Sequence, residues 1–307
     1  MSDIKKKELI CYDRAEICNN TTSQMRGNMF APLDKSRQSN AYKEFVKNDM
    51  ILTFKYGEDT LQIRNRLLTQ RHRDLLDLMF KRAEKKEIKE GYIIMSDFSE
   101  YEILRDLGHK DKHNRNWLRK LIRELQDINI VYINNKKEVA FHIVRAYKIN
   151  KITGKHTIIF DDNYINYFYN KGIGVDYKHM IGDIIALDSP VLKALVRFVI
   201  SNSFDKFKMS LVKILESIGI NKENTGERQY RRIIKIIKNN KAILKEKFNI
   251  VLTDNDIIEY EKLANISFYN INKEQANCTL QYMIEEQKKK DEEEIKESLK
   301  FYYSELI

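Results

Sequence analysis

The sequence predicts an α+β, mainly helical fold in which one structural unit occurs twice along the chain. Between residues 51 and 160, hydrophobic side chains repeat with helix or strand periods in the order helix, strand, helix, turn, helix, hairpin. A similar order returns between residues 161 and 265. With 307 residues and 42% hydrophobic side chains, the chain is long enough for two domains that each have a core.

Composition excludes several classes of protein. Three scattered cysteines, Cys11, Cys18 and Cys278, form no CxxC pair, which indicates a reducing compartment and disfavours a zinc site. No run of about 18 apolar residues occurs, and the first residues lack the apolar core of a signal peptide, so we expect a cytoplasmic protein with no membrane contact. The net charge of +10 suits a polyanionic partner, although the abundance of Lys, Ile and Asn can equally reflect a coding bias.

The two ends of the chain are predicted to differ from its middle. Residues 1–50 are polar and without a sustained period, which predicts a mobile N-terminal arm. Its apolar patch, residues 29–33, is expected to pack on the first domain, with docking on a partner as the alternative. Residues 266–307 combine mixed charges with an apolar end, which predicts a helical tail that packs on the body or on a second copy.

The first predicted domain, residues 51–160, begins with a helix at 67–80 for which Thr69 is a suitable N-cap. A strand is predicted at residues 91–95. Ser99 then caps a short helix that ends at Gly108, because a glycine commonly follows a helix C-terminus.

The third helix of this domain, residues 115–127, places four apolar side chains on one face at helical spacing. Strands at 130–133 and 139–144 follow, and the two asparagines between them suit a tight turn with positive φ. A second hairpin turns at Thr153 and Gly154. This order is that of a winged helix-turn-helix domain, and we interpret the hairpin at 130–144 as its wing.

The second predicted domain, residues 161–265, repeats the order. Its opening helix, 187–203, has Asp188 as a cap and Pro190 in the first turn. A short helix ends at Gly219, in the same way as its counterpart in the first domain. The chain is therefore predicted to contain two tandem winged helix-turn-helix domains.

The third helices of both domains carry polar donors on the face opposite their apolar side chains. The same four helical phases are used in each, and seven of the eight side chains are cationic. A helix that only needed a solvated face would mix Glu with Lys to gain i,i+4 pairs. We therefore predict DNA binding by these two strips, with a merely solvated face as the alternative. The residues are Asn116, Arg119, Lys120 and Arg123 in the first strip and Arg228, Arg231, Arg232 and Lys235 in the second, with Arg115 and Gln229 beside them.

This pattern fits the chemistry of double-stranded DNA. The major groove admits one α-helix, in which Arg reads guanine and Asn or Gln reads adenine. Lys136 and Lys137, at the tip of the predicted first wing, are placed to bind phosphates, although a tip is exposed in any case. A less distinct second wing is predicted at residues 248–253. If both third helices enter one face of the duplex, their half-sites lie about 34–36 Å apart.

The sequence predicts no enzyme activity, no cofactor and no metal site. Residues 154–157 resemble part of a phosphate loop, but the upstream glycine is missing and the segment lies in a predicted hairpin turn. His109 and His113 flank Asp111, but no further strong ligand is near, so a polar turn is favoured over a metal site. No HxH pair accompanies the tyrosines, which disfavours a nuclease that attacks through tyrosine.

The order of residues resembles the plasmid replication initiators of the TrfA type, within the wider group of iteron-binding initiators with two winged helices. The likeness spans roughly residues 28–265 through short, dispersed matches. They are NMFAPL at 28–33, DMILTF at 49–54, the helix at 74–80, Trp117-Leu118 and LKAL at 192–195.

The resemblance implies a protein that binds directly repeated origin sequences, opens an adjacent AT-rich segment and recruits the host replicative helicase and initiator. It also implies no nuclease or ATPase activity, and dimers that are inactive for initiation. The main alternative is a winged-helix transcription regulator bound to a palindromic promoter site. Such regulators often carry a ligand domain, for which no segment of sufficient length is present. A second alternative is a module that uses winged helices for protein contacts.

Overall fold

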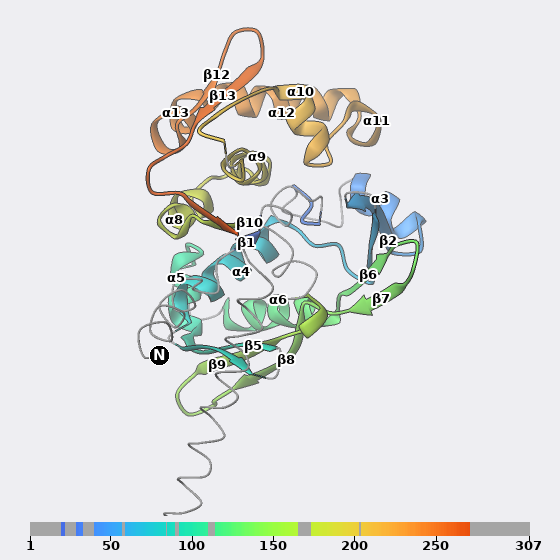
Figure 1. The fold of residues 1–307 in the computed structure, drawn as a ribbon, viewed down its shortest axis with the longest axis vertical. Helices are drawn as coiled ribbons and strands as arrows, with labels where there is room; N and C mark the ends of the chain where they lie inside the picture. Colours follow the sequence, from blue (N-terminus) through green and yellow to red (C-terminus); the bar gives the residue numbers. More distant parts are fainter. Residues whose placement is uncertain are drawn as a thin grey trace, which may run out of the picture.

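The computed structural model describes residues 20–21, 29–32, 40–56, 59–83, 85–89, 92–109, 114–164, 173–202 and 204–270. Helices and antiparallel strands are both abundant in these ranges, which confirms the α+β class. The described residues form two stacked parts: those up to about 160 lie in the lower part of Figure 1, and those from about 178 to 261 in the upper part.

The lower part contains two four-stranded antiparallel sheets and three main helices. The strand orders are β2-β3-β6-β7 and β4-β5-β9-β8. The strands are β2 (Ile51–Tyr56), β3 (Asp59–Arg64), β4 (Lys85–Lys89), β5 (Tyr92–Ser99), β6 (Asn129–Ile133), β7 (Glu138–Phe141), β8 (Val144–Ile149) and β9 (Lys155–Phe160). The helices are α4 (Gln70–Arg82), α5 (Glu100–Asp106) and α6 (Arg115–Asp127).

The local signals in this part act largely as predicted. Thr69 is the N-cap of α4, and the Ser99 hydroxyl accepts the backbone N–H of Tyr101 at the start of α5. Gly108 follows α5 with a φ of +80°, a conformation that glycine adopts without strain. The two predicted caps and the terminal glycine are thus confirmed, although α4 runs from residue 70 to 82 and not from 67 to 80. Strand β4 and the sheet β2-β3-β6-β7 were not predicted as such.

The turn between β6 and β7 forms by a different mechanism from the predicted one. Neither Asn134 nor Asn135 has a positive φ. Instead, the side-chain oxygen of Asn134 accepts the backbone N–H groups of Lys136 and Lys137, both at 2.9 Å. The side chain thus replaces the backbone conformation that the double asparagine suggested.

The upper part contains a chain of helices and a three-stranded sheet with the order β11-β13-β12. The helices are α8 (Ile181–Ile185), which follows the 3₁₀ turn η3 (Lys178–Met180), α9 (Pro190–Ile200), α10 (Leu211–Ser217), α11 (Lys222–Thr225), α12 (Glu227–Asn239) and α13 (Lys241–Phe248). The strands are β11 (Lys206–Ser210), β12 (Ile250–Leu252) and β13 (Ile257–Glu261).

Two predictions for this part are corrected. Ser189, not Asp188, is the N-cap of α9, because Pro190 occupies the first helical position, where its missing N–H costs nothing. Phe248, predicted to begin a wing strand, is the last residue of α13, and the strand starts at Ile250 after Asn249 adopts a left-handed conformation.

The two parts repeat one topology. In the first unit, residues 70–160, β5 lies between the first two helices and pairs with β9, which pairs with β8. In the second unit, residues 190–261, β11 lies between α9 and α10 and pairs with β13, which pairs with β12. Between the third helix and this hairpin, the first unit contains β6 and β7, whereas the second contains α13.

This topology corrects the prediction for the first hairpin. The strands β6 and β7 extend the sheet of β2 and β3, since β3 pairs with β6. The hairpin that corresponds to β12–β13 is β8–β9, with its tip at residues 150–154. Lys136 and Lys137 therefore lie on an additional hairpin and not at the tip of the repeated one.

The ends of the chain also differ from the predictions. Within the predicted arm, α3 (Asn40–Lys47) is helical and β1 (Asn20–Thr21) pairs with β10 (Ile173–Asp176). The patch at 29–32 is buried against the body, and the N–H of Ala31 donates to the carbonyl of Leu68. At the start of the predicted helical tail, β14 (Ser267–Asn270) is a strand that pairs with β10. The rest of both segments lies largely outside the described residues.

A network of buried charges joins the two units at the contact of α4 with α9. The Nη2 of Arg197, on α9, donates to Asp74 at 2.6 Å and to Asp77 at 2.8 Å, and all three side chains are at most 3% exposed. Lys193 donates to the other oxygen of Asp74 at 2.6 Å. Tyr177 donates to Asp77 at 3.0 Å. Each carboxylate of α4 is therefore bound by a side chain from outside the first unit.

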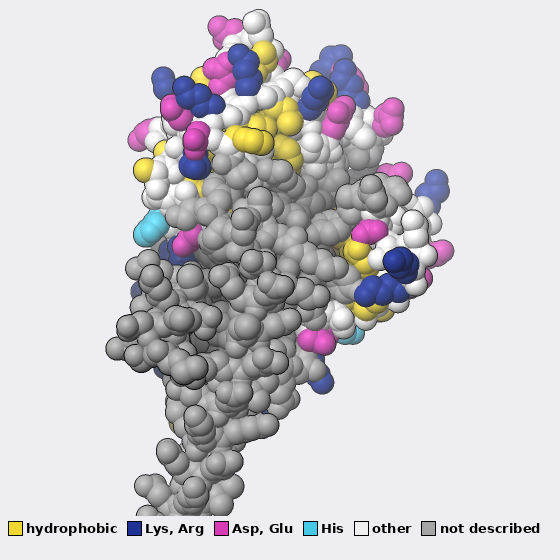
Figure 2. Space-filling model, in the orientation of Figure 1, with side chains coloured by type: hydrophobic (Ala, Val, Ile, Leu, Met, Phe, Trp, Pro, Cys, Tyr) yellow, Lys and Arg dark blue, Asp and Glu magenta, His cyan; other side chains and the backbone are white. Residues whose placement is uncertain are grey.

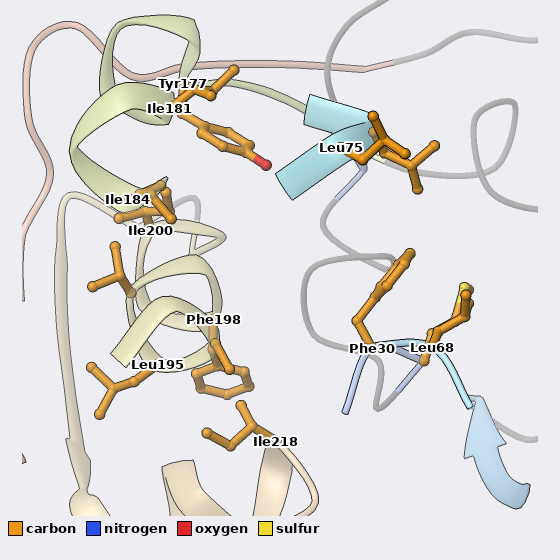
Figure 3. Packing of buried hydrophobic residues seen from close by; sticks show 14 of the residues in the cluster. Phe30, Leu68, Leu75, Tyr177, Ile181, Ile184, Leu195, Phe198, Ile200 and Ile218 are labelled. Atoms are coloured by element: carbon orange, nitrogen blue, oxygen red, sulfur yellow. The ribbon is translucent and has the colours of Figure 1, made fainter. Parts of the chain in front are cut away.

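Apolar packing continues on both sides of this network. Leu75 and Leu195 belong to one buried cluster that extends through both units. Figure 3 shows the Tyr177 hydroxyl pointing toward the helix that carries Leu75, and Phe198 next to Ile218. Burial, and to a smaller extent the charge of Asp77, raises the pKa of Tyr177, so its hydroxyl stays protonated and able to donate.

We predict that Arg197→Met lowers the free energy of unfolding by about 3–5 kcal/mol, because it leaves two carboxylates buried without their shared partner. Chemical denaturation measures this change. The matched control is Lys208→Met, which breaks the exposed pair of Lys208 with Glu259 and is expected to cost less than about 1 kcal/mol. Equal effects of the two substitutions would contradict a special role for the buried network.

Candidate nucleic-acid interface

The predicted strips lie on the outer faces of α6 and α12. On α6, Leu118, Leu121, Ile122 and Leu125 are buried, and on α12, Tyr230, Ile233 and Ile237 are buried. The opposite faces are polar and reach solvent, as the helical period predicted. The two strips nevertheless differ in the contacts that their side chains make within the protein.

In the α6 strip, two arginines are directed at one buried carboxylate. Arg119 donates from Nε to Glu100 Oε1 at 2.6 Å and from Nη2 to Oε2 at 3.1 Å, in a bidentate pair. The Nε of Arg115 lies 3.8 Å from the same carboxylate. Glu100 is only 4% exposed and begins α5. Arg119 is thus held by the protein itself, since its release would leave a buried charge unpaired.

His156 completes this cluster from β9. Its Nε2 lies 2.9 Å from Glu100 Oε1, and its side chain is fully buried. Burial lowers the pKa of His156 below its ordinary value, and Glu100 opposes this shift only in part. Burial also raises the pKa of Glu100, but the hydrogen bond from Arg119 and the nearby His156 lower it more, so the carboxylate remains ionised.

The remaining residues of the α6 strip are less constrained. Arg123 donates to the Tyr147 hydroxyl at 3.0 Å, which ties this strip to β8. Asn116 and Lys120 are exposed, and neither has a hydrogen bond or ion pair with another residue of the described ranges. Of the cationic residues of this strip, only Lys120 therefore has no hydrogen bond or ion pair within the described part of the chain, although its charge helps to lower the pKa of Glu124.

The side chains of the α12 strip are more available for contact with a ligand than those of the α6 strip. Arg228, Arg232 and Lys235 are exposed, and none of the three is hydrogen-bonded or ion-paired to a described residue. Arg231 donates to Glu227 at 2.9 Å, but both partners are well exposed, so this i,i+4 pair is weak and easily exchanged. Gln229 is also exposed. On the face that Figure 2 shows, Lys, Arg, Asp and Glu side chains are interspersed over the upper part of the molecule.

The repeated hairpins contain residues that sequence reasoning did not single out. On β8–β9, Lys148 and Lys151 are exposed near or at the tip, and Arg145 is exposed further along β8. At the tip of β12–β13, Asp254 and Asp256 pair with Lys241 and Lys238 respectively. The sequence analysis did not find these residues because it could not predict strand pairing. Only the pairing of β5 with β9 shows that β8–β9 is the hairpin of the repeated unit.

The side chains of His109 and Trp117 pack edge to face, with ring centroids 4.7 Å apart. The other members of the dismissed metal motif, Asp111 and His113, lie outside the described residues. Within the described ranges, no three His, Cys, Asp or Glu side chains gather in a way that would hold a metal ion. None of the helices described here combines the length and the apolar character that crossing a membrane requires.

Comparisons with known proteins add a weak likeness of fold. No family profile matches the chain, and no curated protein matches its sequence. A crystal structure of domains 2 and 3 of RctB, in selenomethionine form, aligns with a TM-score of 0.44 at 10% identity, covering 81% of this chain and 98% of that one. A second structure of RctB domains 2–3 gives 0.39 at 11%, covering 68% and 87%. These values are too low to support any argument about function.

We predict that stability falls as the pH is lowered, in part because of the Glu100 cluster. A carboxylate with a lowered pKa binds fewer protons when folded than when unfolded, so its contribution is lost as the pH falls below its ordinary value of 4.5. His156, with a pKa below 6.5, acts in the same direction from about that pH downward. Thermal unfolding of Glu100→Gln and of the unmodified chain from pH 7 to pH 3 measures this, and parallel pH profiles would contradict the assignment.

Proposed function

We propose that this chain is a plasmid replication initiator that binds directly repeated double-stranded DNA through two tandem winged helix-turn-helix units. The observation that carries the proposal is the repeated unit of helix, strand, helix, helix and hairpin, in which the third helix is apolar inward and cationic outward both times. A major groove admits one such helix, and two units on one chain suit a composite site. The initiator class is supported by the resemblance of residues 28–265 to the TrfA type.

In this proposal, α12 supplies most of the base readout. Its Arg228 and Arg232 can form bidentate contacts with guanine without breaking a hydrogen bond or ion pair to any described residue. Gln229 lies beside them and can read adenine. In contrast, Arg119 can reach a base only by giving up its two bonds with Glu100. We therefore assign Arg119 to positioning α6 against α5, and Asn116 and Lys120 to DNA contact from the first unit.

The remaining parts of the function follow from the class. We propose that binding of several copies on adjacent repeats opens a neighbouring AT-rich segment, and that the host replicative helicase and initiator are then recruited. The chain itself is proposed to be no enzyme and to use no cofactor. Homodimers are proposed as a reservoir that is inactive for initiation.

A footprint of the purified chain on the DNA that flanks its own gene tests the proposal. We expect several protected direct repeats, each about two helical turns long, next to an AT-rich segment. Shuffled competitor DNA and two salt concentrations separate specific binding from phosphate binding. A single protected palindrome over a promoter would instead identify a transcription regulator, and binding without any preferred site would contradict the initiator proposal.

Arginine substitutions separate DNA contact from structural support. Arg232→Ala is expected to cost about 1–3 kcal/mol at one base position if it reads a base, or to lower the salt slope by about one if it binds phosphate. Its unfolding midpoint is expected to stay unchanged, because the side chain is exposed and has no hydrogen bond or ion pair with a described residue. Arg119→Ala is expected to lower the free energy of unfolding by at least about 1 kcal/mol. DNA affinity is measured by anisotropy and stability by denaturation. If Arg232→Ala lowers stability and leaves DNA affinity unchanged, while Arg119→Ala does the opposite, these roles are excluded.

A further inference from the structure

We infer that the β8–β9 hairpin of the first unit inserts Ile152 into the DNA minor groove as an apolar wedge, while its lysines bind the flanking phosphates. This inference rests on the proposed function and specifies one contact within it. Its starting point is the exposure of Ile152, which at 96% is by far the most exposed of the large hydrophobic side chains in the described ranges. Isolated exposed apolar residues are common on protein surfaces, so the surroundings of this residue decide the argument.

The tip is built to hold Ile152 outward. The side-chain oxygen of Asn150 accepts the backbone N–H groups of Ile152 at 2.9 Å and Thr153 at 3.1 Å. The N–H of Gly154 donates to the carbonyl of Asn150 at 2.8 Å, and Gly154 has a φ of +67°. The N–H of Lys155 donates to the Thr153 hydroxyl at 3.3 Å. A turn fixed by four such bonds is pre-organised, so little conformational entropy is lost when the tip binds.

The hairpin lies beside the α6 strip. Arg123 of α6 donates to Tyr147 of β8, and Gln126 donates to the carbonyl of Arg145. Strand β8 therefore runs antiparallel to α6. The hairpin tip, which follows β8, lies toward the N-terminal end of that helix. A helix in the major groove and a hairpin that extends past its N-terminal end can contact neighbouring grooves of one duplex.

Charge distinguishes this hairpin from its counterpart in the second unit. Residues 144–160 contain four Lys or Arg and no Asp or Glu, whereas residues 250–261 contain four Asp or Glu and no Lys or Arg. Phosphates attract the first hairpin. In the second hairpin, Asp254, Asp256 and Glu259 are paired with Lys241, Lys238 and Lys208 respectively, so it offers phosphates no comparable attraction. The two units therefore use different elements: the second binds chiefly with the third helix, and the first adds its hairpin.

An exposed apolar side chain that is surrounded by cations is better suited to bind the DNA minor groove than to bind the surface of another protein. Proteins that bind this groove combine Lys or Arg with Ile, Leu, Phe or Met, which enters between base steps and bends the duplex by roughly 20–90°. Pyrimidine–purine steps such as TA and CA/TG are the easiest to kink. We therefore expect a bend in the bound DNA, centred on the base step that Ile152 contacts.

The test uses the full chain and the DNA fragment that the footprint protects. Ile152→Ala is compared with the unmodified chain, with Ile152→Leu, and with Val46→Ala, which truncates another exposed apolar side chain, on α3. Anisotropy measures affinity, and the gel mobility of circularly permuted fragments measures the bend. A second arm replaces adenine by 2,6-diaminopurine, which adds an amino group to the floor of the minor groove and leaves the major-groove edge unchanged.

We expect Ile152→Ala to bind roughly tenfold more weakly, because it loses most of the apolar surface that insertion buries. The bend should decrease and the unfolding midpoint should not change, whereas Ile152→Leu and Val46→Ala should bind normally. Diaminopurine in the DNA should weaken binding by the unmodified chain more than it weakens binding by Ile152→Ala. If Ile152→Ala binds and bends the protected DNA as the unmodified chain does, the wedge is excluded and the proposed function stands. If the unmodified chain has no preferred DNA site, both are overturned.

Discussion

The ion network between α4 and α9 constrains the whole arrangement. Two carboxylates of α4 share the guanidinium of Arg197, and Lys193 binds one of them from the same helix. The Coulomb energy of these buried charges offsets their desolvation only while all partners are in place. The opening helices of the two units are therefore fixed against each other, and the offset between α6 and α12 is a property of the protein that any bound duplex has to match.

The same topology supports different chemistry in the two units. Glu100 and His156 occupy the interior of the first unit and hold Arg119, whereas the second unit leaves Arg228 and Arg232 free of described partners. For the hairpins the order is reversed. The cationic hairpin, β8–β9, belongs to the first unit, whose third helix has fewer free cations. A repeated fold thus does not imply two equivalent DNA contacts, and the surface charges suggest a division of roles between the units.

Wherever the determinants are local, the sequence predicted this protein well. The limits of α6 follow from apolar side chains at helical spacing, and the end of α5 follows from a glycine that tolerates positive φ. Local patterns also showed which faces of α6 and α12 point outward. Predictions that depended on strand pairing were less successful, because two consecutive hairpins, β6–β7 and β8–β9, look alike along the chain and only their partners distinguish them.

By itself, then, the sequence determined the repeated order of elements, the inward and outward faces of the third helices, and the residues that we propose to bind DNA. Only the tertiary structure decided which of those residues are available. Arg119 and Arg231 have the same chemistry and the same helical phase, yet Arg119 binds a buried carboxylate contributed by α5, whereas Arg231 pairs with the exposed Glu227 of its own helix. Such contacts join residues far apart in the chain, and no local period records them.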